Sequence, residues 1–280
     1  MDWLIEPFEL AFQQRALLAG ALASVTLAVA GTWVVIRGMA FLGDALAHGV
    51  IPGIALAVLL DFNLVVGAAV AAVVMILAIN LVHRQATFSQ DTAIGLLFAG
   101  MLGLGVILVS RTTSYTGSLT SILFGDILGV SAQDLVTQAV VLAVAVAVAV
   151  LFYRPFLVLS FNEQKAEVLG LRPGLANAVL LGLVTVAIVG SFQAVGTLLV
   201  FGLLVGPPAT ATLVARRVPA VMVTAALIGL VSVAVGLIIS YHAGTAGSAT
   251  MAVVPIVLFF MVLVVRSLAE RRRDAVAARA

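Results

Sequence analysis

The chain of 280 residues has no cysteine and few charged side chains, and both absences narrow what it can be. Without cysteine it forms no disulfide and no thiolate metal site, so any bound metal meets oxygen and nitrogen ligands. Charged residues make up 9% of the chain and apolar residues 63%, which indicates an integral membrane protein. The net charge of +2 gives no reason to expect a nucleic-acid partner.

Several motifs that carry chemistry are also missing. The chain has no GxxxxGKS/T phosphate loop, no HExxH zinc motif, no paired Asp-rich clusters and no regular ladder of arginines. It therefore cannot hydrolyse a nucleotide itself, and metalloprotease and voltage-sensor activities have no support. If ATP drives its function, another polypeptide supplies the ATPase.

Uncharged runs of membrane length indicate the fold class. A spanning helix needs roughly 20 residues, and four runs match that length: 16–36, 62–82, 92–110 and 135–153. The runs 173–215 and 218–265 are twice as long and are interrupted at 190–193 and 241–248, so each is expected to form a helical hairpin. We expect an all-α polytopic membrane protein with eight or nine transmembrane helices.

The region around Asp44 is harder to assign. Only 16 uncharged positions separate Asp44 from Asp61, so this span is either short or begins a turn before Asp44. Nine spans use about 180 residues, which leaves no room for a separate soluble domain. We expect a single transmembrane domain over 1–280, with a polar cytoplasmic segment at 154–174 and a basic cytoplasmic tail at 266–280.

The distribution of lysine and arginine predicts the orientation, because cytoplasmic loops retain positive charge. With the C-terminal arginines inside, counting nine spans backward leaves only Arg15 and Arg111 outside. An eight-span protein would need part of the chain flipped or the segment 40–60 re-entrant. The residues expected inside are Arg37, Arg84, Arg154, Lys165, Arg172, Arg216, Arg217 and Arg266.

Asp44 and His48 are the main candidate for a functional site. They are four residues apart in an apolar region of membrane length, so on a helix they share one face about 6 Å apart at Cβ. Ionisable groups at membrane depth are expensive and usually functional, and a carboxylate with an imidazole can bind a divalent cation. A symmetric dimer could bring a second pair to complete the coordination shell. The alternative is that Asp44 caps a helix beginning after Gly43, with His48 bonded to nearby backbone.

Two further segments have a structural and a functional interpretation. Pro52 and Gly53 weaken the helix just after His48, which suits a substrate path but also occurs in ordinary transmembrane helices. Residues 162–169 are expected to form a short amphipathic helix with Asn162 as N-cap, Glu163 in its first turn and Gly170 closing it. That helix is either a solvated connector or a docking element for a cytoplasmic partner. The spacing Gly202-xxx-Gly206 is interpreted as helix packing.

These segments, taken in order, match a known family. They are 37–53 (RGMAFLGDALAHGVIPG), 91–95 (DTAIG), 123–129 (LFGDILG), 166–170 (AEVLG) and 196–211 (GTLLVFGLLVGPPATA). Over nearly its whole length the chain resembles the permease subunits of bacterial ABC transporters that import zinc, manganese or iron. The sequence of residues 37–50 is most similar to that of the zinc branch, so zinc is the expected substrate, with manganese or iron as the alternative.

The resemblance implies residue roles and partners. It implies that Asp44 and His48 are the metal ligands of the pathway, and that the 162–170 helix couples the permease to an ATPase subunit. The residues assigned to that coupling are Asn162, Glu163, Ala166, Glu167, Leu169 and Gly170. The implied partners are a cytoplasmic ABC ATPase, an extracytoplasmic solute-binding protein, a second copy of the chain and membrane lipid. The implied location is the bacterial cytoplasmic membrane, with the C-terminus inside.

One segment departs from the family pattern. Between the last two spans the family commonly carries an Asp-Pro-Ser-Gly-like segment, whereas this chain has AGTAGS at 243–248. No metal role is assigned there, and His242 is at most an outer-gate contact. Two rival classes stay open: a proton- or sodium-coupled secondary carrier that uses the same pair, and a membrane-embedded enzyme with a single metal, which would need a third ligand and a base.

Overall fold

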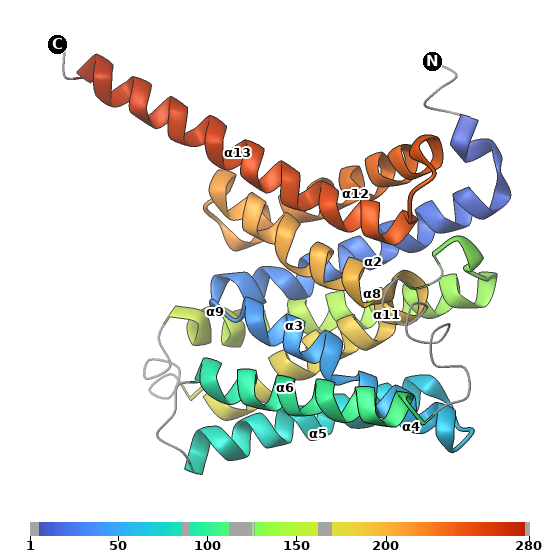
Figure 1. The fold of residues 1–280 in the computed structure, drawn as a ribbon. Coiled ribbons are helices and arrows are strands. Elements are labelled where there is room, and N and C mark those ends of the chain that lie inside the picture. The colour runs from blue at the N-terminus through green and yellow to red at the C-terminus, as the bar shows by residue number, and fades with distance from the viewer. Residues whose placement is uncertain (1–5, 86–89, 112–124, 126, 162–169, 278–280) are drawn as a thin grey trace.

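The computed structural model describes residues 6–85, 90–111, 125, 127–161 and 170–277. Every regular element within these residues is helical, which confirms the all-α prediction. The elements are η1 (Glu6–Glu9), α2 (Ala11–Ile36), α3 (Ala40–Gly49), α4 (Ile51–Leu59), α5 (Leu64–Gln85), α6 (Gln90–Val109), η2 (Ile127–Gly129), α8 (Ala132–Leu151), α9 (Tyr153–Phe161), α11 (Pro173–Val214), α12 (Val218–Ala243) and α13 (Gly247–Ala277) (Figure 1).

The predicted span count agrees with the described helices. Eight helical segments are long and apolar enough to cross a membrane, and α5 carries a shorter apolar stretch, Leu64–Ile79. The span around Asp44 begins a turn earlier, at Ala40, and consists of α3 and α4 together. The expectation that this span begins a turn before Asp44 is therefore correct.

The run 173–215 forms a hairpin, but it breaks at Gly196 rather than at 190–193. Gly196 has φ 78° and ψ 160°, which is outside the helical region. Asn177 in the first half bonds to Arg37 at the end of α2, and Leu204 in the second half lies against Gly31 of the same helix. A straight helix would separate Asn177 from Leu204 by about 40 Å, whereas Gly31 and Arg37 are about 9 Å apart along α2. The two halves of α11 therefore run antiparallel.

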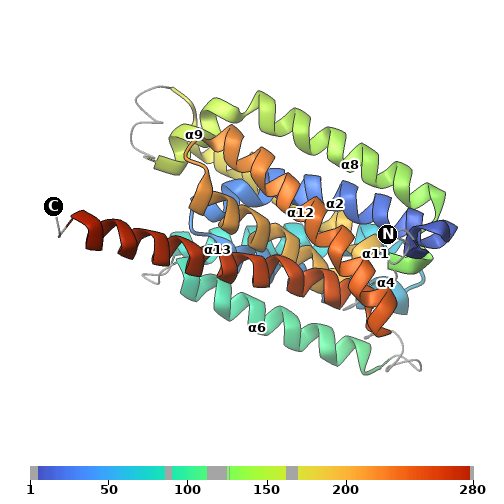
Figure 2. The same ribbon diagram turned by 90° about the horizontal axis from the view of Figure 1, so that it is seen from above.

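The run 218–265 is also a hairpin, with its break at 244–246 between α12 and α13 as expected. Helix α13 then continues without interruption into the basic tail as far as Ala277. Its 31 residues extend about 46 Å, which exceeds the roughly 30 Å of a hydrocarbon core. Its C-terminal part accordingly projects beyond the bundle (Figures 1 and 2).

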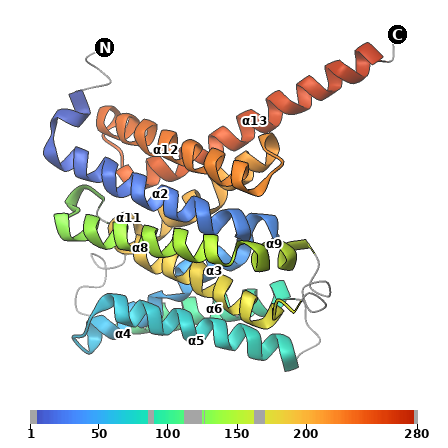
Figure 3. The same ribbon diagram turned by 180° about the vertical axis from the view of Figure 1, so that it is seen from behind.

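Helix α2 lies in the interior of the bundle, packed against α8, α11 and α12 (Figure 3). Lipid is as apolar as a leucine side chain, so membrane helices associate largely by close packing of small residues. Accordingly, alanines at 16, 19, 23 and 30 of α2 are fully buried. The Gly202-xxx-Gly206 pair packs closely on Ala252 and Pro255 of α13, which confirms its interpretation as a packing motif.

The closest approach joins α2 to the second half of α11. Pro208 has no N–H, so it cannot donate to the carbonyl of Leu204 one turn earlier. That carbonyl oxygen lies against Gly31, where any Cβ would overlap it. Glycine at position 31 therefore lets the two backbones meet and gives the carbonyl a Cα–H neighbour.

The segment 154–174 was expected to be polar, but its first part is a helix with buried apolar side chains. This helix is α9, whose residues Phe156 and Leu159 are buried. Phe156 and Tyr153 pack edge-on against Trp33 of α2, with ring centroids 5.4 Å and 5.7 Å away. Burial against Trp33 stabilises a helix that the charge pattern of the sequence did not reveal.

We expect Gly31→Ala to lower the stability of the folded chain by about 1 to 3 kcal/mol, because the added methyl group must push α2 away from α11. The measurement is the fraction of detergent-purified protein that stays monodisperse after heating. Gly182→Ala is the control: nothing lies within 4 Å of its Cβ position, and alanine favours the helix. Equal stability of the two variants would contradict this account.

Candidate functional site

The candidate metal ligands lie on one face of α3. The Nδ1 atom of His48 is 3.2 Å from Oδ1 of Asp44, and the two side chains are 22% and 25% exposed, respectively. Helix α3 begins at Ala40, with Met39 at its N-cap position. Asp44 therefore lies inside the helix, and the alternative in which it caps a helix after Gly43 is wrong.

The imidazole of His48 is turned toward its own helix. Nδ1 also lies 3.2 Å from the backbone oxygen of Asp44, so the expected contact with neighbouring backbone exists beside the contact with the carboxylate. When Nδ1 is protonated and donates to these oxygens, Nε2 carries the lone pair that can ligate a cation. The carboxylate then orients the imidazole and also supplies anionic charge beside it.

A break in the helix follows His48 directly. Helix α3 ends at Gly49 and α4 begins at Ile51, with Pro52 in its first turn. Because Pro52 has no N–H, the carbonyl of His48 cannot bond to the residue four positions on and accepts from the N–H of Val50 instead. The interruption predicted from Pro52 and Gly53 is thus present one turn from the ligand pair.

Helices α5, α6 and α11 are among those that pack against α3. Phe98 of α6 lies edge-on to the His48 ring, with centroids 5.9 Å apart, and packs in the same way on Phe41. A Cβ at Gly43 would meet Leu204 of α11, and one at Gly49 would meet Met75 of α5. The sequence analysis did not single out Phe98. The nearest feature that it noted is the family-like segment 91–95 at the start of α6.

The described part of the chain brings no third ligand to the pair. No group of three or more His, Cys, Asp or Glu side chains is found among these residues. The described residues of one chain would therefore supply two side-chain ligands, fewer than the four to six that a divalent transition metal usually takes. The rival hypothesis of a membrane-embedded enzyme with a single metal needs a third ligand, and the described residues do not provide a His, Cys, Asp or Glu for that role.

The other predicted site residues divide into two groups. Asn162, Glu163, Ala166, Glu167 and Leu169 lie outside the described residues, as does the helix expected there. Gly170 is described: it is exposed, with φ 69°, the left-handed conformation that glycine adopts after a helix. His242 is exposed near the end of α12, with its ring 5.1 Å from that of Tyr241.

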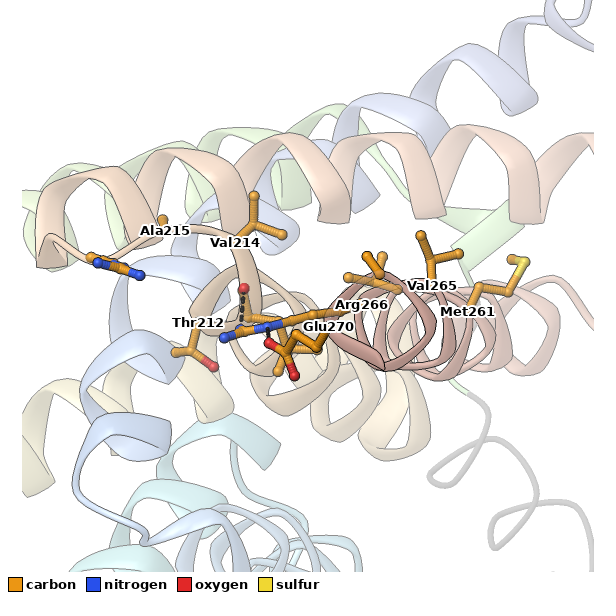
Figure 4. Close-up of a pocket in the computed structure, with 11 residues that line it drawn as sticks. Thr212, Val214, Ala215, Met261, Val265, Arg266 and Glu270 are labelled. Atoms are coloured by element: carbon orange, nitrogen blue, oxygen red, sulfur yellow. Dashed lines mark hydrogen bonds and ion pairs between the residues drawn. The ribbon is translucent and has the colours of Figure 1, made fainter. Parts of the chain in front are cut away.

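A hollow of about 660 Å³ lies elsewhere, between the end of α11 and α13. Figure 4 shows that Arg266 reaches Glu270 on its own helix and a backbone oxygen of α11. The ion pair measures 2.9 Å, and the oxygen belongs to Leu213. Glu270, the acidic residue that lines this hollow, is thus paired with Arg266, so the lining offers a cation no carboxylate without a partner.

Comparison with known proteins defines the class. Residues 9–266 match the family model described as the ABC 3 transport family. The manganese transport system membrane protein MntC of Listeria monocytogenes is 35% identical over 250 residues, 89% of each chain. The chelated iron transport system membrane protein YfeD of Yersinia pestis is 32% identical over 259 residues, 92% of this chain and 87% of that one.

A solved structure agrees with the sequence relatives. The structure titled PsaBC from Streptococcus pneumoniae in complex with Fab matches with a TM-score of 0.84 and 29% identity, covering 92% of this chain and 94% of the matched one. The chain belongs to the ABC 3 transport family. It is a multi-pass transmembrane permease of this family, as the resemblance in its motifs predicted.

We expect Phe98→Ala to loosen the His48 ring, because both edge-on aromatic contacts of Phe98 are lost at a cost of about 1 kcal/mol each. Diethyl pyrocarbonate should then modify His48 faster relative to His242, which is exposed in the folded chain and serves as the internal standard for the reagent; mass spectrometry resolves the two sites. Leu96→Ala is the matched control, since Leu96 is 67% exposed on the same helix. An unchanged rate at His48 would mean that Phe98 does not hold the ring.

Proposed function

We propose that this chain is the permease subunit of an ABC importer for a divalent transition-metal ion, and that Asp44 and His48 ligate the ion on its way through the membrane. The observation that carries this proposal is the 3.2 Å Asp44–His48 pair on one face of α3, within a permease of the ABC 3 transport family. A carboxylate and an imidazole inside a spanning helix need a partner, and a divalent cation satisfies both.

The identity of the metal depends on more than these ligands. One oxygen and one nitrogen ligand per chain, without thiolate, suit zinc, manganese and ferrous iron, and affinity order alone does not select among them. The relatives MntC and YfeD are named as manganese and chelated-iron transport proteins, which supports manganese or iron. The support for zinc is the similarity of the sequence around Asp44 and His48 to the zinc branch of the family. Competition among the three metals during uptake decides between these readings.

A second copy of the chain completes the site in this proposal. Asp44 and His48 are about three-quarters buried, so part of each side chain stays accessible for a ligand from outside the chain. A two-fold dimer would bring two such pairs together across a central pathway and give four side-chain ligands. Transient binding by such a shell is compatible with release, which a tight, closed metal site would prevent.

The energy source and the delivery of the metal come from other subunits. An extracytoplasmic solute-binding protein delivers the ion, and two cytoplasmic ABC ATPase subunits bind at residues 162–170. Closure of the ATPases on ATP then drives alternating access in the permease dimer. The break between α3 and α4 supports this motion, because it allows the helix to adjust one turn from the ligands.

Asp44→Asn and His48→Gln should each reduce metal uptake about tenfold or more, because each removes one of the two ligands in every subunit. The measurement is uptake of radiolabelled zinc, manganese and iron by a metal-limited strain that lacks the native permease and expresses each variant at matched levels. The metal that wild type restores identifies the substrate.

Asp61→Asn is the control for this test. Asp61 is an exposed acid at the end of the same span, and asparagine tolerates its left-handed φ of 53° equally well. Full uptake by the Asp44 and His48 variants would place the pathway elsewhere. Uptake that persists with a hydrolysis-dead ATPase would favour the secondary carrier.

We propose an orientation in the cytoplasmic membrane with the C-terminus inside. The alternation of the described helices places Arg216, after α11, at the end of the bundle opposite Asp61 and Tyr241. All three are exposed. Because the chain has no native cysteine, Asp61→Cys and Tyr241→Cys should react with an impermeant maleimide in intact cells, and Arg216→Cys only after permeabilisation. The reverse pattern would invert the topology.

A further inference from the structure

A hydrogen bond between α2 and α11 connects two parts of the chain to which separate roles are assigned above. Nη1 of Arg37 donates to Oδ1 of Asn177 at 2.8 Å, and the contact is partly buried. Arg37 ends α2, just before the helix that carries the metal ligands. Asn177 lies in the first turn and a half of α11, and it is the first side chain of that apolar run that can form a hydrogen bond.

The link from Arg37 to the metal ligands is short and rigid. The N–H of Gly38 bonds to Val35 at 3.0 Å and that of Met39 to Val34 at 2.9 Å, and Gly38 has φ 67°. This is the Schellman arrangement that closes a helix tightly. Helix α3 begins at the next residue, Ala40. A displacement of Arg37 is therefore passed to α3 through a two-residue corner.

The link from Asn177 toward the proposed ATPase-binding segment is also short. Gly170 and Arg172 both have left-handed φ values, 69° and 43°, and Pro173 begins α11. Arg172 is not glycine and precedes a proline, so its conformation is strained and is held by its surroundings. The chain thus turns sharply into α11 within seven residues of Asn177.

We propose that the Arg37–Asn177 hydrogen bond transmits movement of the start of α11 to the α2–α3 corner, and so couples ATP hydrolysis to the position of Asp44 and His48. This inference rests on the proposed function. Arg37 and Asn177 act here as positioning residues: neither binds the metal. The contact joins the start of α11, next to the segment proposed to meet the ATPase, to the start of the helix that holds the ligands.

The test is the number of metal ions transported per ATP hydrolysed by the whole complex. The permease is reconstituted in proteoliposomes with its ATPase and solute-binding protein, and both rates are measured on the same preparation. Asn177→Leu and Arg37→Gln should each lower this ratio at least fivefold while ATP hydrolysis stays within twofold of wild type. The double variant should be no worse than the worse single variant, because both remove the same contact.

Two further variants separate coupling from simple packing. Asn177→Asp keeps an acceptor for the guanidinium and should retain at least half of the wild-type ratio. Arg216→Gln removes an exposed arginine at the same end of the bundle and should leave the ratio unchanged. If Asn177→Leu does not assemble with the ATPase, Asn177→Ala takes its place: it removes the acceptor without adding apolar bulk and should lower the ratio to the same degree.

The outcomes are distinguishable. An unchanged ratio in Asn177→Leu and Arg37→Gln, or a parallel fall of transport and hydrolysis, overturns the coupling role and leaves the proposed function standing. Additive effects in the double variant also overturn it. Absence of ATP-driven metal transport by wild type overturns the proposed function itself, and the coupling role with it.

Discussion

The contact between Gly31 and the carbonyl of Leu204 is the constraint on which the arrangement around the ligands depends. Burial of apolar surface cannot drive helix association in lipid, so the bundle relies on backbone approach and on a partner for every polar backbone group. Pro208 leaves the Leu204 carbonyl without its helical donor, and Gly31 accommodates it. The Leu204 side chain also lies against Gly43 of α3. One residue of α11 therefore sets the positions of both α2 and the helix that carries Asp44 and His48.

The spans were predictable because bilayer thickness sets the length of an uncharged helix, and no folding detail enters that argument. The break between α12 and α13 was also predictable from its turn residues, but the position of the break within α11 was not. The reversal at Gly196 depends on Gly125, which has φ 65° and lies against the Gly196 backbone although 71 residues earlier in the chain. Helix α9 likewise depends on Trp33. Contacts between distant residues leave no local pattern, so 154–161 was assigned to a polar segment.

The candidate site was predictable to the same extent. Spacing of four residues places Asp44 and His48 on one helix face in any amphipathic or buried helix, and the structure has them 3.2 Å apart. Spacing could not predict that α3 starts before Asp44, which removes the capping alternative, nor that Phe98 of α6 packs on the imidazole. The sequence did not single out Asn177, whose partner Arg37 lies 140 residues away.

The reversal of α11 bears on how the protein enters the membrane. Ser191, Phe192 and Val195 beside the turn are buried, so the turn lies within the protein and no polar loop separates the two halves. Just before the turn, the side chain of Gln138 of α8 donates to the carbonyl of Gly190 at 3.3 Å. Helix α8 is synthesised before α11. During biogenesis α8 is therefore in place as a packing surface before the two halves of α11 are made, and the short turn keeps these halves next to each other.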